Sequence, residues 1–250
     1  MFDEVGRNAG RFILVSLRGA LLVAATAWAM QASEITWGSP TNETGNAGDV
    51  VTAGTFLESA FAGLVDVTLN GVVFAHSTNS SNPGTFADGS DITFDNVDGF
   101  NAAAGSAPGG WNSSYQTLTD TADYEGTGNM EIILGGLISG DQYEVQIFEP
   151  WWNNQFPTTY SDGTDVSGAL NTGYSTTVPQ YITGTFTADS TSETLFLGGT
   201  NTYALTSAVQ VRDLTSGSIS PVPEPSTVWI LASGLVALAF ARRFSVRRAA

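Results

Sequence analysis

Short runs of alternating apolar and polar residues, separated by turn-forming residues, fill the central part of this chain. Mostly apolar side chains recur at every second position in residues 65–69 (VDVTL), 143–147 (YEVQI) and 205–211 (LTSAVQV). A period of two residues gives a strand one face for a core, whereas a helix needs a period near 3.6, which is almost absent here. We therefore expect residues 33–215 to form one all-β domain.

The expected strands are short and are divided by long polar loops. They cover residues 34–37, 49–56, 65–69, 72–74, 92–94, 115–119, 130–134, 143–148, 180–187, 194–197 and 205–211. The Asn70-Gly71 pair predicts a tight hairpin, because both turn residues must take positive φ. A domain of this length with about ten short strands has more strands than an immunoglobulin-like module. This number favours a jelly-roll-like β-sandwich.

The last thirty residues have a different composition from the rest of the chain. Pro223-Glu224-Pro225 is followed by an uncharged apolar run, and the chain then ends in a tail with four arginines, Arg242, Arg243, Arg247 and Arg248. A helix rises about 1.5 Å per residue, so the apolar run reaches the low end of what crosses a bilayer. The arginines favour the cytoplasmic side and stop the segment there. We expect a linker at 216–225, a transmembrane helix at 226–241 and a basic cytoplasmic tail at 242–250.

This order of parts resembles the PEP-CTERM sorting signal of Gram-negative bacteria. The resemblance implies that Pro223, Glu224 and Pro225 form the motif recognised by an exosortase, a membrane transpeptidase-like enzyme that cuts near it. The tail would hold the protein in the inner membrane until that cut, after which the body is released or attached to surface material. The alternative is a plain tail anchor, which needs no Pro-Glu-Pro step and is usually longer.

The first 32 residues are expected to be a secretory signal peptide that directs the chain to the Sec machinery. Arg7, Arg11 and Arg18 form a basic leader, and the apolar segment 19–29 follows. Small residues around Ala29 and Ala32 offer cleavage sites. An uncleaved N-terminal anchor is the alternative. Both ends of the chain predict the same orientation, with the arginines inside and the body outside.

The exported body is strongly acidic and contains neither cysteine nor lysine. Between Ser33 and Ser220 it carries 21 acidic residues and one arginine, Arg212, a net charge of −20. Such a charge repels nucleic acid, so we expect no nucleic-acid partner. The absence of cysteine excludes disulfides, thiol catalysis and thiolate metal sites.

Catalytic groups are scarce in the body. With His76 as its single histidine, pairs of a nucleophile and a base are nearly excluded, and we expect no enzymatic activity. A pair of carboxylates could in principle serve a secreted polysaccharide hydrolase. Because acidic residues are frequent here, their proximity in sequence carries little information.

Three acidic loops are candidate calcium sites, because calcium prefers several oxygen ligands. The candidate ligands are Asp88, Asp91, Asp95, Asp98, Asp162 and Asp165. None of the loops fits an EF-hand pattern. A structural calcium ion is the cofactor that this composition allows, and the alternative for each loop is a solvated turn.

A loop rich in aromatic residues is the best candidate for contact with a ligand. The candidate residues are Trp151, Trp152, Phe156 and Tyr160, which lie among Asn153, Asn154 and Gln155, together with Trp111 in an earlier loop. Flat rings and amides are suited to sugar faces and hydroxyls, and binding sites combine aromatic surface with a few polar groups. The alternative is that these rings pack into the end of the sandwich.

The second half of the body, residues 130–214, resembles the galactose-binding-like jelly rolls, with the pattern Gly-Leu-x-x-Gly-x-x-Tyr-x-Val-x-Ile at residues 136–147. The expected function is that of an exported, non-catalytic protein of the cell surface or extracellular matrix, binding glycans such as exopolysaccharide or forming part of the matrix. A self-associating structural or adhesive surface protein is the alternative from another class.

Overall fold

The computed structural model describes residues 34–78, 82–103, 107, 109–126, 130–152, 154–199 and 203–215. The expected signal peptide, the Pro-Glu-Pro linker, the transmembrane segment 226–241 and the basic tail lie outside these residues and stay predictions. In the described part of the chain, no helix has the length and apolar character needed to cross a membrane.

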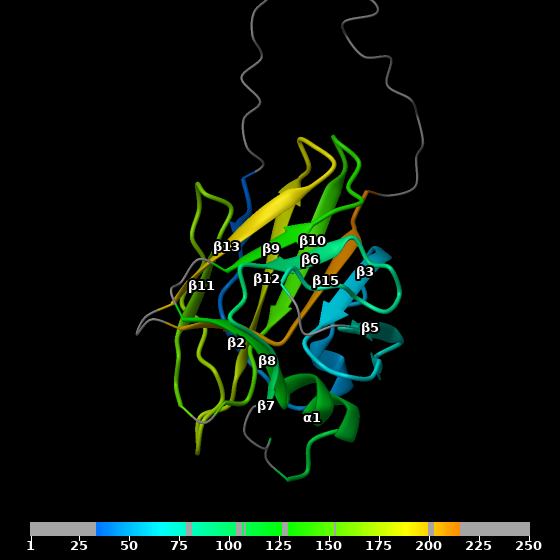
Figure 1. The fold of residues 1–250 in the computed structure, drawn as a ribbon. Helices are drawn as coiled ribbons and strands as arrows, with labels where there is room; N and C mark the ends of the chain where they lie inside the picture. Colours follow the sequence, from blue (N-terminus) through cyan, green and yellow to red (C-terminus); the bar gives the residue numbers. More distant parts are fainter. Residues whose placement is uncertain are drawn as a thin grey trace, which may run out of the picture. The chain divides into compact units, whose positions relative to one another are not determined.

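The larger of the sheets has eight strands among the described residues (Figure 1). Its order is β1 (Thr36–Trp37), β12 (Gln180–Thr187), β10 (Gln142–Phe148), β15 (Ala208–Asp213), β3 (Thr55–Phe61), β5 (Val72–His76) and β4 (Val67–Leu69), and β2 (Thr41–Asn42) also pairs with β12. Neighbours are antiparallel except β3 and β5, which run parallel. The central strands β12, β10 and β15 come from the middle and the end of the body. They pair with β1, β2 and β3, which come from its start.

A four-stranded antiparallel sheet packs against one face of this larger sheet. It contains β11 (Thr158–Ser161), β13 (Glu193–Gly199), β9 (Glu131–Leu134) and β6 (Ile92–Asp95), in that order. Figure 1 shows β13, β9 and β6 in front of β12, β10 and β15. A third sheet of β14 (Ala204–Thr206), β8 (Thr121–Glu125) and β7 (Gly99–Ala103) completes the described strands.

The main core lies between the two larger sheets. Val145, Ile147 and Val209 of the eight-stranded sheet share a cluster with Ile132 and Leu195 of the four-stranded sheet, and all five are fully buried. Burying one such side chain stabilises the fold by roughly 1.5–3 kcal/mol. The prediction of an all-β sandwich is therefore confirmed.

A second core covers the other face of the larger sheet, under helix α1 (Ser113–Thr119). Tyr115 and Leu118 of the helix pack with Phe61, Phe74 and Phe148 of the sheet. We expected a strand at residues 115–119, and the structure corrects this to a helix. The Asn112 side chain caps the helix by accepting hydrogen bonds from the amides of the second and third residues after it, at 2.9 and 3.4 Å.

The Asn70-Gly71 hairpin is confirmed. It joins β4 to β5, and the two turn residues have φ values of 50° and 78°. Other boundaries differ from expectation. The expected strand 49–56 begins in a 3₁₀ turn, η1 (Ala47–Asp49), and β7 and β11 form where no strand was expected. Strand β8 was not expected.

Candidate ligand-binding site

A pocket of about 330 Å³ opens on the body, and four aromatic rings line it. Tyr124, Trp152, Asn154, Phe156 and Tyr203 form this aromatic pocket. Tyr124 comes from β8, Tyr203 directly precedes β14, and the other three come from the segment between β10 and β11. Strands β8 and β14 pair with Leu205 opposite Tyr124, which brings Tyr203 close to Tyr124. Of the five aromatic residues predicted to contact a ligand, the pocket contains Trp152 and Phe156.

The rings form a continuous series around the pocket. Ring centroids are 6.0 Å apart for Trp152 and Tyr124 and 6.2 Å apart for Tyr124 and Tyr203. Phe156 and Tyr203 are 5.1 Å apart. The planes are tilted by 51° to 58°, a common arrangement for aromatic pairs. Tyr203 is 40% exposed, and Asn154 is exposed as well, so the site combines an aromatic surface with a polar residue at its edge.

Backbone contacts hold the pocket segments in place. The Phe156 amide donates to the Thr172 hydroxyl at 3.0 Å, and this hydroxyl donates to the Asn154 carbonyl at 2.9 Å. The Trp152 amide donates to the Gly173 carbonyl at 2.8 Å. At Gly199, an added Cβ would lie 2.0 Å from the Tyr203 carbonyl oxygen, so the close approach of Tyr203 requires glycine at this position.

Trp151 and Tyr160 lie in the interior instead, which corrects their assignment to a ligand site. Trp151 is 7% exposed and packs edge-to-face on Trp111 at 6.1 Å. Trp111, half-buried, continues this series to Tyr115 at 5.5 Å and joins the second core. Tyr160 is fully buried, and its hydroxyl is hydrogen-bonded inside the body. These three residues therefore provide the packing that we gave as the alternative.

Tyr124, Asn154 and Tyr203 are members of the pocket that the sequence did not indicate as site residues. Tyr124 belongs to a strand that was not expected, and Tyr203 lies in a connection with no other aromatic residue nearby in sequence. They meet Trp152 through the pairing of β8 with β14, which joins residues about eighty positions apart. No local pattern in the sequence predicts the pairing of β8 with β14.

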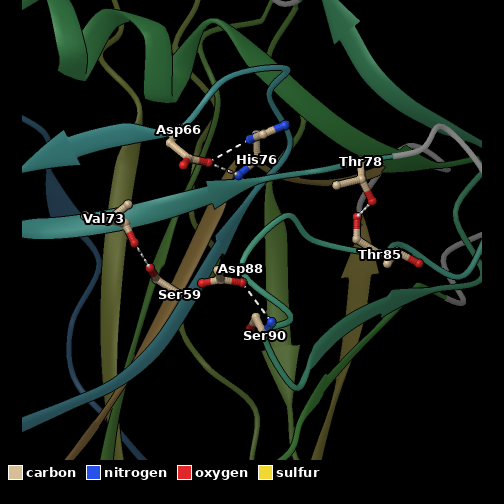
Figure 2. A network of polar contacts seen from close by, with 8 residues as sticks. All are labelled: Ser59, Asp66, Val73, His76, Thr78, Thr85, Asp88 and Ser90. Atoms are coloured by element: carbon tan, nitrogen blue, oxygen red, sulfur yellow. Dashed lines mark hydrogen bonds and ion pairs between the residues drawn. The ribbon is translucent and has the colours of Figure 1, made fainter.

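Four of the six predicted calcium ligands accept hydrogen bonds from backbone amides in this structure. Asp88 accepts a hydrogen bond from the Ser90 amide at 2.7 Å (Figure 2), and Asp98 accepts one from the Gly126 amide at 2.9 Å. Asp162 accepts from the amides of Ile35, Thr164 and Asp165 at 2.6 to 2.7 Å. Asp95 accepts from the amide of the next residue at 2.8 Å.

Within the described residues, no three carboxylates or imidazoles are arranged to hold a metal ion. Asp91 contributes its backbone amide to Glu58 at 2.5 Å. The geometry therefore offers no support for calcium at these six aspartates, and a structural calcium ion stays a prediction from composition.

His76 is hydrogen-bonded to Asp66 at the surface. Its Nδ1 lies 2.6 Å from Asp66 Oδ1, and its amide donates to the same oxygen at 3.1 Å (Figure 2). These hydrogen bonds lower the pKa of Asp66. Close by, the Ser59 hydroxyl donates to the Val73 carbonyl at 2.5 Å and ties β3 to β5. The contacts of His76 thus stabilise the β4–β5 hairpin.

The comparisons with known proteins concern the tail and the fold separately. Residues 221–243 match the PEP-CTERM protein-sorting motif. No curated protein matches the chain. A solved structure, the Bacteroides uniformis beta-glucuronidase, matches with 12% sequence identity and a TM-score of 0.36, covering 58% of this chain and 16% of that one.

Together, these findings define a β-sandwich protein with an aromatic pocket and a sorting tail. The chain carries the PEP-CTERM motif, as its last thirty residues predicted, and the motif implies export and an exosortase as the processing partner.

Proposed function

We propose that the exported body binds a neutral polysaccharide through the aromatic pocket and performs no catalysis. The observation that carries this proposal is the series of four rings around a pocket of about 330 Å³, with Tyr203 40% exposed. Sugar rings present C–H faces to aromatic surfaces, and Asn154 adds a polar residue to the lining. A volume near the lower end of typical ligand sites, roughly 300–1,000 Å³, suits one or two sugars of a longer polymer.

The charge of the body supports a neutral ligand. With a net charge of −20 over residues 33–220, the body repels polymers rich in uronic acid or sulfate. The lining of the pocket contains four rings and one amide, a set suited to holding a sugar chain by stacking and hydrogen bonding. The sorting motif implies export, which agrees with a ligand found outside the cell.

Affinity electrophoresis of the full chain tests this proposal. The gels would contain hydroxyethylcellulose, galactomannan or polygalacturonate, one at a time. We expect retardation by at least one of the two neutral polymers and none by polygalacturonate. Trp152→Ala and Tyr203→Ala should each weaken the retardation about tenfold, because aromatic anchors at binding sites commonly contribute more than about 1.4 kcal/mol.

The matched control is Tyr174→Ala, because Tyr174 is 43% exposed but does not line the pocket. This variant should bind as the parent does, and melting curves should show that all variants are folded. Equal loss in Tyr203→Ala and Tyr174→Ala, or no retardation by either neutral polymer, would contradict the proposal. Oligomers that form without polysaccharide would instead favour the self-associating surface protein.

A further inference from the structure

Two of the three segments that form the aromatic pocket meet inside the body at one buried contact, the segment between β10 and β11 and the start of β14. The Tyr160 hydroxyl lies 2.7 Å from Glu149 Oε1 and 3.2 Å from the Leu205 carbonyl oxygen. Glu149 precedes Trp152 by three residues, Tyr160 follows Phe156 by four, and Leu205 follows Tyr203 by two. Glu149 and Tyr160 are fully buried. This Glu149–Tyr160–Leu205 chain therefore links the walls of the pocket to one another.

The number of hydrogens in this chain depends on the protonation of Glu149. A tyrosine hydroxyl has one hydrogen, yet two acceptors lie within its reach. If the Glu149 carboxyl is protonated, it donates to the Tyr160 oxygen, and Tyr160 donates to the Leu205 carbonyl. If Glu149 is ionised, the single hydrogen is drawn to the charged oxygen, because charge-assisted hydrogen bonds are the stronger ones. The Leu205 carbonyl then loses its donor.

No positive charge compensates Glu149 within the described residues. The two basic residues there are engaged elsewhere, Arg212 with the carbonyls of residues 52–54 and His76 with Asp66. Glu149 Oε2 is buried without a hydrogen-bond partner. Burial raises the pKa of Glu149 well above its usual range, and the Tyr160 hydrogen bond offsets part of this.

The other titratable groups around this position are acidic or neutral. Glu43, which follows β2, is buried, and burial, followed by the charges of Asp49 and Glu149, raises its pKa. Beyond Glu43 lie Asp49 and Tyr115. On the side of β14, Asp123 of β8 lies opposite Thr206 in the strand register. None of these groups supplies a positive charge, so burial remains the cause that favours a protonated Glu149.

We propose that Glu149 is a proton-dependent positioning residue of the aromatic pocket. When Glu149 is protonated, both hydrogen bonds of the Glu149–Tyr160–Leu205 chain form. They hold residues 149–152, the Trp152 segment, in a fixed position relative to residues 203–205, the Tyr203 segment. Without the proton, the Leu205 carbonyl is released, the Tyr203 segment loosens and the pocket binds polysaccharide more weakly. The effect on affinity rests on the function proposed above, whereas the effect on the Tyr203 segment does not.

Two variants separate the protonation states. In Glu149→Gln, the amide donates to Tyr160 at every pH, so this variant should keep the pocket in the ordered state. In Tyr160→Phe, both contacts are lost at every pH, so this variant should keep it loose. Glu43→Gln is the control, because it removes a neighbouring acid and leaves the hydrogen-bonded chain intact.

The first measurement uses the full chain without any polysaccharide. Hydrogen exchange of the peptide covering residues 203–207, corrected for intrinsic rates, would be followed from pH 5 to pH 9. The parent and Glu43→Gln should show a rise of about fivefold across one titration, the effect expected for one lost hydrogen bond. Glu149→Gln should stay protected throughout. A rise in Glu149→Gln equal to that of the parent overturns the proposal.

The second measurement follows affinity for the neutral polymer that retards the parent most strongly. We expect the affinity of the parent to fall about fivefold across the same titration, and that of Glu149→Gln to stay constant. A constant affinity in the parent despite the exchange transition overturns the link to binding. If no polymer is bound at any pH, the proposed function fails and the affinity effect with it, whereas the exchange measurement still decides whether Glu149 positions the Tyr203 segment.

Discussion

Glu43 shows what a single buried acid does to this fold. It is 3% exposed, and no positive charge lies among the groups that shift its pKa, where the Tyr115 hydroxyl is the one neighbour that favours the ionised form. Burial, together with the charges of Asp49 and Glu149, raises its pKa well above 4.5. The folded state therefore binds the proton more tightly than the unfolded chain. Stability should fall as the pH rises from about 4.5 to the pKa of the folded state.

Glu43→Gln should reduce this dependence on pH, because the amide has a similar shape and does not ionise. We expect the melting temperature of the parent to be lower at pH 8 than at pH 5. At pH 8, the variant should melt at least about 2–4 °C higher than the parent, the shift that 1 kcal/mol gives in a domain of this size. Asp88→Asn, which removes a charge at an exposed position, is the control for net charge. Parallel pH profiles of Glu43→Gln and the parent would refute this explanation.

Single residues of the site were only partly predictable. Trp151 and Trp152 are neighbours in sequence, but one lies in the interior against Trp111 and the other lines the pocket. An aromatic loop indicates that some ring contacts a ligand. Which ring does so depends on backbone contacts to distant residues, such as those of Trp151 to Thr119 and of Trp152 to Gly173. The local sequence around Trp151 and Trp152 does not predict these contacts.

At the scale of elements, one cation fastens the segment that leads into β3. Arg212 of β15 is buried, and its guanidinium donates to the carbonyls of Thr52, Ala53 and Gly54 at 2.5 to 3.0 Å. It also lies over the Phe56 ring, with the centroid 6.0 Å away. Hydrogen bonds to charged groups contribute about 1.5–3 kcal/mol each, so these contacts should matter to stability.

Arg212→Met should lower the free energy of unfolding by about 2–4 kcal/mol, because it removes three hydrogen bonds and leaves partly buried carbonyls without a donor. Phe56→Ala should cost less than about 1 kcal/mol, since the ring is 41% exposed and its contact with the cation is weak. Urea denaturation of both variants measures the difference. Equal losses would show that the cation–ring contact, and not the carbonyl contacts, holds the segment.

Two elements with strong local patterns were predicted well, whereas the alternating run 205–211 is divided at Ser207 between β14 and β15, which belong to different sheets. Strand β12 has the expected bounds, and the Asn70-Gly71 turn forms the expected hairpin, because both depend on alternation and turn chemistry. Residues 115–119 were misassigned because Tyr115, Leu118 and Thr119 suit either element. The Asn112 cap and packing against Phe148 determine the helix. Strand β8 was missed because its partners, β7 and β14, are themselves short.

For the whole molecule, the sorting tail predicts a processed C-terminus. The parent, produced in its own cells, should lose the apolar run and the arginines of the tail. Glu224→Ala should keep both and stay with the membrane, because the substitution removes the charged residue of the matched motif. Intact mass of the exported and membrane fractions gives the answer. A tail that is retained in the parent would indicate a plain membrane anchor.

Export and the aromatic pocket together lead to one prediction: polysaccharide bound at the pocket holds the body outside the cell. The most direct test is the distribution of the exported protein between the extracellular polysaccharide of its own cells and the surrounding medium, for the parent, Tyr203→Ala and Tyr174→Ala. We expect the parent and Tyr174→Ala in the polysaccharide fraction and Tyr203→Ala in the medium. Retention of folded Tyr203→Ala at the level of the parent would contradict this prediction.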